Sequence, residues 1–272
     1  MSSVTPNLAS PSPLPLQVIF VGSVRQLVPP EAEAEVRALL VQHNCVPVFM
    51  EPWLQSSHRN GYAPLVLWPL LHNQIPDRHA GGKGGDGSRV AALWSAYARA
   101  NDEFAAVIRG MLRQGDMVWV HSYPLLLLPR ALRCGRMPKH CIISFFLHSP
   151  FPSPEVWRVL PHRAELLQGM LASHVVGFHL FEYARHFMTS CRRLLGLGEN
   201  VGAGPAGGVL SIDLGSRCVT ITVCCLFSSS DTDPGPSGRR GVSPHQHESL
   251  TKQHESLPTL PPSGESCGHR PC

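Results

Sequence analysis

Short apolar runs alternate with segments of helical periodicity over the first 195 residues of the chain. LQVIFVGSV (16–24) and CVPVFM (45–50) are short apolar runs, the first rich in β-branched residues, which predicts two buried strands. Between them, EAEAEVRALLVQHN places Val36, Leu39 and Leu40 at helical spacing, with acidic residues in its first turn. A strand, a helix and a strand in succession form a βαβ unit, in which the two strands are parallel.

The same alternation continues along the chain. Helices are expected at 61–72 (ended or kinked near Pro69), 88–114, 125–133, 161–172 and 181–195, and strands at 116–122, 141–149 and 174–179. Residues 207–225 alternate like a β-hairpin that turns near Gly215 and Ser216. Strands that alternate with helices over so long a stretch predict an α/β fold, a Rossmann-like doubly wound parallel sheet.

The two ends of the chain differ from this middle part. Residues 1–15 are rich in Ser and Pro and are expected to form a flexible leader, and residues 16–226 to form one domain. Residues 227–272 are polar and proline-rich and contain QHESL twice. Such a segment buries too little apolar surface to offset its ordering entropy, so we expect a disordered C-terminal tail.

Composition narrows the class of protein further. Hydrophobic residues make up 43% of the 272 residues, which is enough for a sizeable core, and a net charge of +4 is too small to indicate nucleic acid. No run reaches the 18 apolar residues of a membrane span, and the N-terminus lacks the pattern of a secretory signal. Nine cysteines at scattered spacings match no disulfide framework. We therefore expect a cytoplasmic protein with reduced thiols, bound neither to membrane nor to nucleic acid.

Candidate ligand-binding residues follow from the fold, because doubly wound sheets bind ligands beyond the carboxyl ends of their strands. HSYP (121–124) and HSPFP (148–152) occupy such positions. His148 stands where a strand gives way to a proline-rich loop, so its imidazole is expected to be exposed. There it could bond a sugar hydroxyl or act as an acid or base, or it could merely end the strand.

Other candidates have an ordinary structural alternative. Trp68 and Tyr62 could present aromatic faces to a ring ligand or belong to the core, and Arg59 and Arg158 could meet a phosphate or remain solvated. The glycine-rich segment 79–88 lacks the Gly-Lys-Ser/Thr of a phosphate loop. The Asp-Thr-Asp, histidines and cysteines of the tail match no closed zinc site, so neither a metal nor a cofactor is expected.

Several segments together resemble trehalose-6-phosphate synthases, and the opening resembles the larger plant-type members. The resemblance runs from about residue 17 to about 224 and is carried by VLWPLLH, VWVHSYPLLLLPRALR, FFLHSPFP, LPHRAELL and GFHLFEYARHFMTSCRRLLGL. It implies a glycosyltransferase that moves glucose from UDP-glucose to glucose 6-phosphate with retention and without metal. The family has two facing Rossmann-like domains, the GT-B arrangement, and only the N-terminal, acceptor-binding domain matches here.

The resemblance assigns roles to residues on matching positions. His148 takes the place of the family's histidine in F-F-L-H-x-P-F-P, which contacts the transferred glucose. Trp68 takes the place of the tryptophan in L-W-P, which lines the acceptor pocket.

The remaining motif positions are partly degenerate. His121 and Tyr123 match the family's H-D-Y-H, but the aspartate that binds an acceptor hydroxyl is Ser122, and the last histidine is Pro124. Arg59 aligns with an acceptor-contacting tyrosine of the family.

The resemblance therefore predicts a truncated protein of trehalose biosynthesis that is inactive alone, because the donor-binding domain and its cations are not matched. Glucose 6-phosphate remains a possible ligand, and UDP-glucose only if a second domain is supplied. Three alternatives stay open: a regulatory or scaffold subunit that associates with full-length synthases, a sugar-phosphate binding module without catalysis, and a gene-model or splice product that folds poorly.

Overall fold

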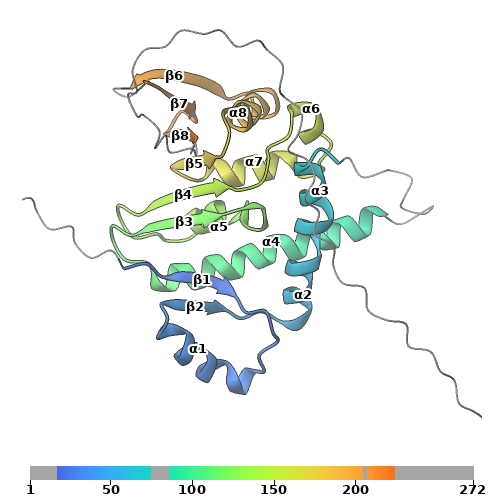
Figure 1. The fold of residues 1–272 in the computed structure, drawn as a ribbon, viewed down its shortest axis with the longest axis vertical. Coiled ribbons are helices and arrows are strands. Elements are labelled where there is room, and N and C mark those ends of the chain that lie inside the picture. Colours follow the sequence, from blue (N-terminus) through green and yellow to red (C-terminus); the bar gives the residue numbers. More distant parts are fainter. Residues whose placement is uncertain (1–16, 75–85, 205–206, 224–272) are drawn as a thin grey trace, which may run out of the picture. The chain divides into compact units, whose positions relative to one another are not determined.

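The computed structural model describes residues 17–74, 86–204 and 207–223 (Figure 1). The predicted leader (1–15), the predicted tail (227–272) and most of the glycine-rich segment 79–88 lie outside the described residues. The strands are β1 (Phe20–Ser23), β2 (Cys45–Val48), β3 (Met117–His121), β4 (Ile142–Leu147), β5 (Val175–Phe178), β6 (Gly198–Gly204), β7 (Gly207–Asp213) and β8 (Cys218–Val223). The α-helices are α1 (Glu33–Val41), α2 (Pro52–Asn60), α3 (Trp68–Leu71), α4 (Asp86–Met111), α5 (Leu128–Cys134), α6 (Pro154–Trp157), α7 (Arg163–Leu171) and α8 (Phe181–Leu195).

Short helical turns complete the connections. A π-helical turn (Ala63–Leu67) leads directly into α3, and 3-10 turns precede α1 (Pro30–Ala32) and α5 (Tyr123–Leu125). Pro69 stands in the first turn of α3, at the point where the π-helical turn gives way to α-helix. No helix among the described residues is long and apolar enough to cross a membrane.

The strands form two sheets. β1 and β2 pair in parallel, and six strands in the order β3-β4-β5-β8-β7-β6 form the larger sheet. In that sheet β3, β4, β5 and β8 are parallel, and β7 pairs antiparallel with both β8 and β6. The predicted parallel α/β fold and the hairpin at 207–225 are therefore confirmed.

Strand register aligns the carboxyl ends of β3, β4 and β5 at one edge of the sheet. His121 pairs with Phe146, and Leu147 pairs with Phe178. The residues that leave these strands, His148 and His179 among them, therefore emerge side by side.

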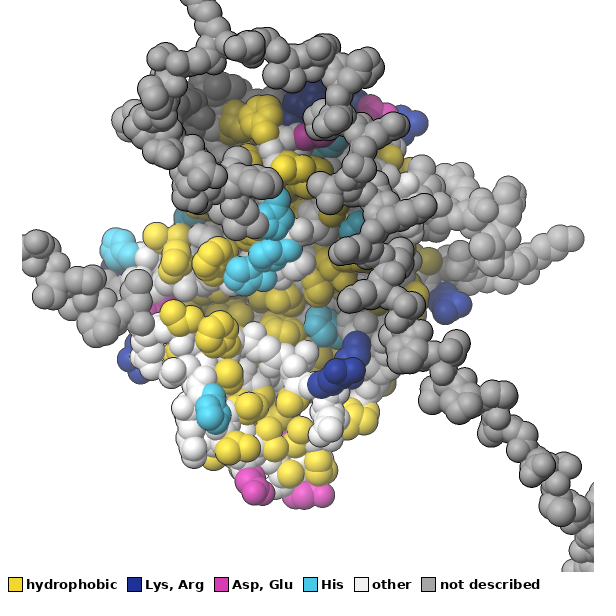
Figure 2. Space-filling model, in the orientation of Figure 1, with side chains coloured by type: hydrophobic (Ala, Val, Ile, Leu, Met, Phe, Trp, Pro, Cys, Tyr) yellow, Lys and Arg dark blue, Asp and Glu magenta, His cyan; other side chains and the backbone are white. Residues whose placement is uncertain are grey.

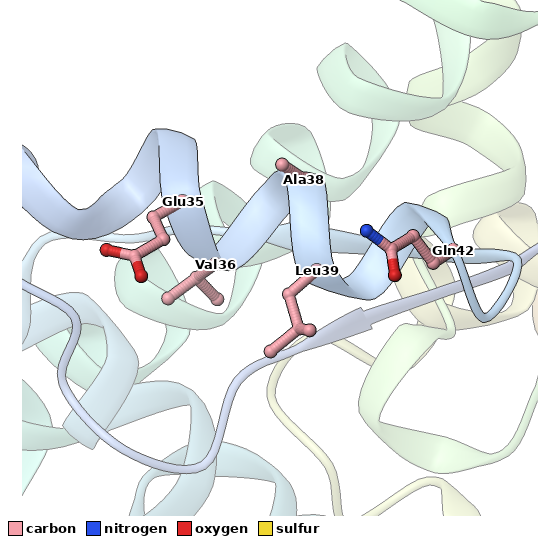
Figure 3. A pocket seen from close by; sticks show the side chains of 5 residues that line it. All are labelled: Glu35, Val36, Ala38, Leu39 and Gln42. Atoms are coloured by element: carbon pink, nitrogen blue, oxygen red, sulfur yellow. The ribbon is translucent and has the colours of Figure 1, made fainter.

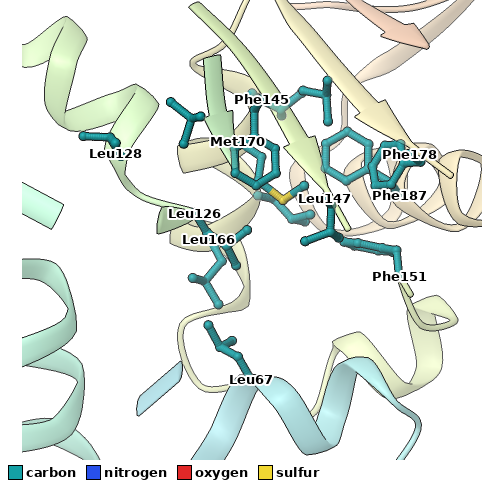
Figure 4. Packing of buried hydrophobic residues seen from close by; sticks show 14 of the residues in the cluster. Leu67, Leu126, Leu128, Phe145, Leu147, Phe151, Leu166, Met170, Phe178 and Phe187 are labelled. Atoms are coloured by element: carbon teal, nitrogen blue, oxygen red, sulfur yellow. The ribbon is translucent and has the colours of Figure 1, made fainter. Parts of the chain in front are cut away.

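Most of the core lies between the larger sheet and its helices. The buried residues include Phe145 and Leu147 of β4, Phe178 of β5 and Phe187 of α8 (Figure 4). The Phe151 ring stacks on Trp157 at 4.6 Å and meets Phe187 edge-on at 5.4 Å. This aromatic packing fixes the loop that follows β4 and so helps to hold His148 at the sheet edge.

One expectation about the elements was wrong, and other elements were missed. The 16–24 run was expected to be buried, but β1 lies in the two-stranded sheet and the Phe20 side chain is 65% exposed. Helices α2 and α6 and strand β6 were not expected. The α2 segment is polar overall, and GENVGAG has no alternation of apolar and polar side chains.

Candidate functional site

Three histidines from three adjacent strands meet at the carboxyl edge of the sheet. His121 ends β3, and His148 and His179 directly follow β4 and β5. Nδ1 of His121 lies 2.9 Å from Nε2 of His148, within hydrogen-bond distance, and the two ring centroids are 5.2 Å apart. The His179 ring is 5.4 Å from that of His148. Histidine side chains gather beside hydrophobic ones on the face of the molecule shown in Figure 2.

Aromatic side chains of β3 and β4 contact the rings of this histidine cluster. Phe146 of β4 contacts the rings of His148 and His179, with centroid distances of 4.8 and 4.9 Å. Trp119 of β3 lies 4.8 Å from His121. The expectation that His148 is exposed is confirmed.

Burial lowers the pKa of two of these imidazoles, those of His121 and His148. Partial burial lowers the pKa of His121. Burial also lowers the pKa of His148, and the neighbouring His121 and His179 lower it further, because a second positive charge would lie beside the first. In the neutral pair one imidazole donates the shared hydrogen bond and the other accepts it.

A second group of aromatic residues surrounds Trp68, the first residue of α3. Trp68 is 46% exposed, although a tryptophan in an apolar helical run is more often part of the core. The ring lies 3.9 Å from that of His72 and 5.4 Å from that of Tyr123. The buried Tyr97 hydroxyl donates to the Tyr123 carbonyl over 2.8 Å, which anchors the loop after β3. Trp68 therefore presents an open aromatic face beside Tyr123.

Ser122 connects the two groups through an unusual backbone conformation. Its φ of 69° and ψ of 173° fall in a region that glycine alone adopts without strain. Its N–H donates to the Phe146 carbonyl over 2.8 Å. This one residue turns the chain between His121 of the histidine cluster and Tyr123 beside Trp68.

The other candidates have different surroundings. The Arg59 guanidinium donates to the Arg25 carbonyl over 2.6 Å, so it holds the loop that follows β1. Tyr62 is fully buried, and among the described residues its hydroxyl has no hydrogen-bond partner. Burial, reinforced by Glu165, raises the pKa of Tyr62 well above its usual range, so Tyr62 belongs to the core. Arg158 is exposed.

Two surface hollows lie away from these residues. One, of about 470 Å³, runs along α1 between Glu35 and Gln42 and is lined by a single helix (Figure 3). Another, of about 280 Å³, lies between the start of α4 and His162. Neither contains a residue named above for sugar binding. Within the described ranges, no three histidine, cysteine or acidic side chains are placed to share a metal ion.

His179 was missed by the sequence analysis. The signal was present, since GFH ends a predicted strand as VWVH and FFLH do. Parallel strands that each end in histidine bring those histidines to the same edge of a sheet. The repetition of this pattern in three predicted strands is therefore a signal of the cluster in the sequence itself.

Comparison with known proteins places the fold and these motifs in a family. Residues 8–224 match the model of glycosyltransferase family 20, so the chain belongs to that family. It is 39% identical over 191 residues to the alpha,alpha-trehalose-phosphate synthase [UDP-forming] A of Dictyostelium discoideum, covering 70% of this chain and 25% of the relative. It is 44% identical over 158 residues to the corresponding enzyme of Emericella nidulans, covering 57% of this chain and 30% of that one. The chain therefore spans about a quarter to a third of the length of these relatives.

Solved structures agree on the fold. The N-terminal domain of the Candida albicans trehalose-6-phosphate phosphatase superposes with a TM-score of 0.60 at 30% identity, over 72% of this chain and 38% of that one. A trehalose-phosphate synthase from Burkholderia xenovorans in complex with glucose-6-phosphate gives a TM-score of 0.55 at 23% identity, over 66% and 36%. The fold is thus found in proteins named for two different reactions.

Proposed function

We propose that this domain is the acceptor-binding half of a trehalose-phosphate synthase of the GT-B type and acts in the cytoplasm in trehalose biosynthesis. The 272-residue chain by itself binds glucose 6-phosphate and does not transfer glucose. Membership of glycosyltransferase family 20, together with the open face of Trp68 beside Tyr123, is the observation that carries this proposal. The described cysteines form no disulfide, which is consistent with a reducing compartment.

The sugar ring would lie against Trp68. An aromatic face offers an apolar surface to the C–H face of a hexose, and Trp68 is held in place by His72 and Tyr123. His148 and His121 supply imidazole nitrogens that can donate to or accept from sugar hydroxyls. Ser122 can bond a hydroxyl but brings no negative charge, so acceptor binding is weaker than in relatives with aspartate there.

Transfer requires more than this half of the site provides. The leaving nucleoside diphosphate must be stabilised by fixed cations, and donor and acceptor must be held together in a closed cleft. Within the described residues, the histidine cluster contacts other imidazoles and aromatic rings. UDP-glucose would therefore bind productively only with a second domain present.

A second candidate function is association with a full-length synthase. Leu180 and Phe181, which directly follow His179, are both exposed large apolar residues. An apolar rim of this kind beside a polar site favours contact with another protein surface. If this candidate is right, the chain co-purifies with a full-length synthase, and replacing both residues by serine abolishes the co-purification. A chain that remains monomeric in that mixture would refute this candidate.

Calorimetric titration of the 272-residue chain tests sugar binding. We expect heat with glucose 6-phosphate and none with UDP-glucose. Trp68→Ala should weaken glucose 6-phosphate binding at least tenfold, which is about 1.4 kcal/mol. Trp53→Ala is the matched control. Trp53 of α2 is also exposed, at 51%, but its ring contacts the Arg99 guanidinium of α4 instead of the residues around Trp68.

The same samples test the absence of transfer. A coupled assay should detect no UDP release when both substrates are present. Release that depends on glucose 6-phosphate would overturn the proposal that the chain is inactive alone. Equal weakening by Trp68→Ala and Trp53→Ala would overturn the proposed place of the sugar.

A further inference from the structure

Within the described residues, the histidine cluster has no acidic partner of the kind that commonly accompanies histidines in proteins. The charge interactions on His148 within the described residues come from two other imidazoles, His121 and His179. The serine at 122 leaves the neighbouring turn without a carboxylate. Protonation of this cluster therefore builds positive charge that no described side chain neutralises.

Charged groups on the surrounding elements are already paired with one another. On α8, Glu182 lies 3.8 Å from both Arg185 and His186. Glu155 of α6 accepts a hydrogen bond from Arg193 of α8 over 2.5 Å. The pairing leaves these groups balanced among themselves.

Two further side chains, Tyr123 and His72, bring no negative charge to these surroundings. Burial raises the pKa of Tyr123, so its phenol stays neutral. His72, on the far side of Trp68, bonds to the Trp68 carbonyl over 2.7 Å. Within the described residues, therefore, no carboxylate is paired with the cluster to supply this countercharge.

The N-terminus of α8, at the edge of the cluster, adds an electrostatic field that favours an anion. α8 has 15 residues and starts at Phe181, two positions after His179. Its N-cap, Leu180, offers no side-chain hydrogen bond to the first turn. The positive end of the helix dipole thus lies next to the third imidazole and favours an anion on the same side.

We propose that His121, His148 and His179 form a proton-linked binding site for a tetrahedral oxyanion, namely a phosphate group, whether free or carried by a small metabolite. An oxyanion bonded to the imidazole N–H groups supplies the missing negative charge and binds together with one or more protons. Binding therefore strengthens as the pH falls. The site shares His121 and His148 with the proposed sugar site, but it also needs His179 and the start of α8, and it needs no sugar ring.

Inorganic sulfate is the first probe, because its charge does not change between pH 6 and 8. Titration of the full chain, followed through the imidazole C–H signals in NMR spectra, should show binding at least tenfold tighter at pH 6.0 than at pH 8.0. The signals of three histidines should shift together. Inorganic phosphate at pH 6.0 should compete for the same site.

Two variants separate a built site from diffuse attraction. His179→Gln should weaken sulfate binding at pH 6.0 at least fivefold while the circular dichroism spectrum stays unchanged. His140→Asn is the matched control, because His140 is exposed, precedes β4 at the opposite edge, and has a φ of 60° that asparagine tolerates. It should leave sulfate affinity unchanged.

Three results would overturn the proposal. These are sulfate affinity that is equal at both pH values, equal weakening by the two variants, or shifts spread over all histidines as expected for an adventitious ion only. Glucose and glucose 6-phosphate distinguish this site from the sugar site. If sulfate binds and glucose 6-phosphate shows no advantage over it, the anion site stands and the proposed acceptor site fails. If glucose 6-phosphate binds equally at both pH values and sulfate does not bind, the reverse holds.

Discussion

Two histidines of the same sheet, His174 before β5 and His148 after β4, have opposite surroundings. At the amino edge, the Ile143 N–H donates to Nδ1 of His174 over 2.9 Å, and Nη2 of Arg133 lies 3.0 Å from Nε2. The protein thus supplies the hydrogen-bond donor to Nδ1 of His174, and Arg133 lies beside the same ring. At the carboxyl edge, the described contacts of His148 are one hydrogen bond to His121 and several rings.

The amino edge is built from groups that bond one another. Arg133 donates to the Ala172 carbonyl, and Arg217 donates to the carbonyls of Leu171 and Ser173. These carbonyls lie at the end of α7, where a helix leaves its last acceptors without partners. Polar groups at this edge therefore stabilise the fold, whereas those at the carboxyl edge remain open to a ligand.

Removing an arginine of the amino edge should have the largest effect. Arg217→Leu leaves two carbonyls without their charged donor, and we expect the free energy of unfolding in urea to fall by about 2–3 kcal/mol. Arg193→Leu is the control, since Arg193 pairs with the exposed Glu155 and should change stability little. Sulfate affinity should survive Arg217→Leu in the folded protein. Loss of binding in the folded variant would show that the two edges are not separate.

The pH dependence of stability should be next in size. Burial lowers the pKa of His174, with Arg133 adding to the effect, and burial lowers that of His148. Below the unfolded pKa of about 6.5, these histidines bind protons in the unfolded chain but much less in the folded chain. The free energy of unfolding therefore falls as the pH falls. One histidine can contribute at most about 1.4 kcal/mol per pH unit, and solvent reduces this for partly exposed rings.

Sulfate should separate the two histidines in that measurement. His174→Gln and His148→Gln should each flatten the acid side of the stability curve measured by urea unfolding. Added sulfate should recover stability at pH 6 in the His174→Gln variant and much less in His148→Gln. Equal recovery in both would contradict the contrast between the edges.

Replacing Ser122 by glycine should give the smallest change in the free energy of unfolding, and this change is an increase. Ser122→Gly relieves a strained conformation, and we expect the free energy of unfolding to rise by roughly 0.5–1 kcal/mol. Ser95→Gly is the control, because Ser95 lies inside α4, where glycine destabilises by roughly 0.5 kcal/mol. Thermal unfolding of both variants measures these two opposite changes in stability. A loss of stability in Ser122→Gly would show that the turn is not strained.

The sequence predicted those parts of the molecule whose periodicity is strong. The helix expected at 181–195 has those bounds, and the parallel strands that carry His121 and His148 are confirmed. Exposure of β1 could not be predicted, because an apolar run does not reveal whether a neighbouring strand covers it. The contact of Arg59 with the loop after β1 joins residues 34 positions apart and has no local signal. The roles of Trp68, Tyr123 and His148 in sugar binding stay predictions.

The break between the two sheets has a practical consequence for anyone preparing the protein. β3 is one of the two edge strands of the larger sheet and carries exposed Met117 and Trp119, and β1 of the smaller sheet carries exposed Phe20. Open strand edges with apolar side chains are templates for intermolecular β-pairing. Yield in expression will therefore be limited by aggregation at these edges, and a lysine in place of Met117 or Phe20 is the substitution that should keep the chain in solution.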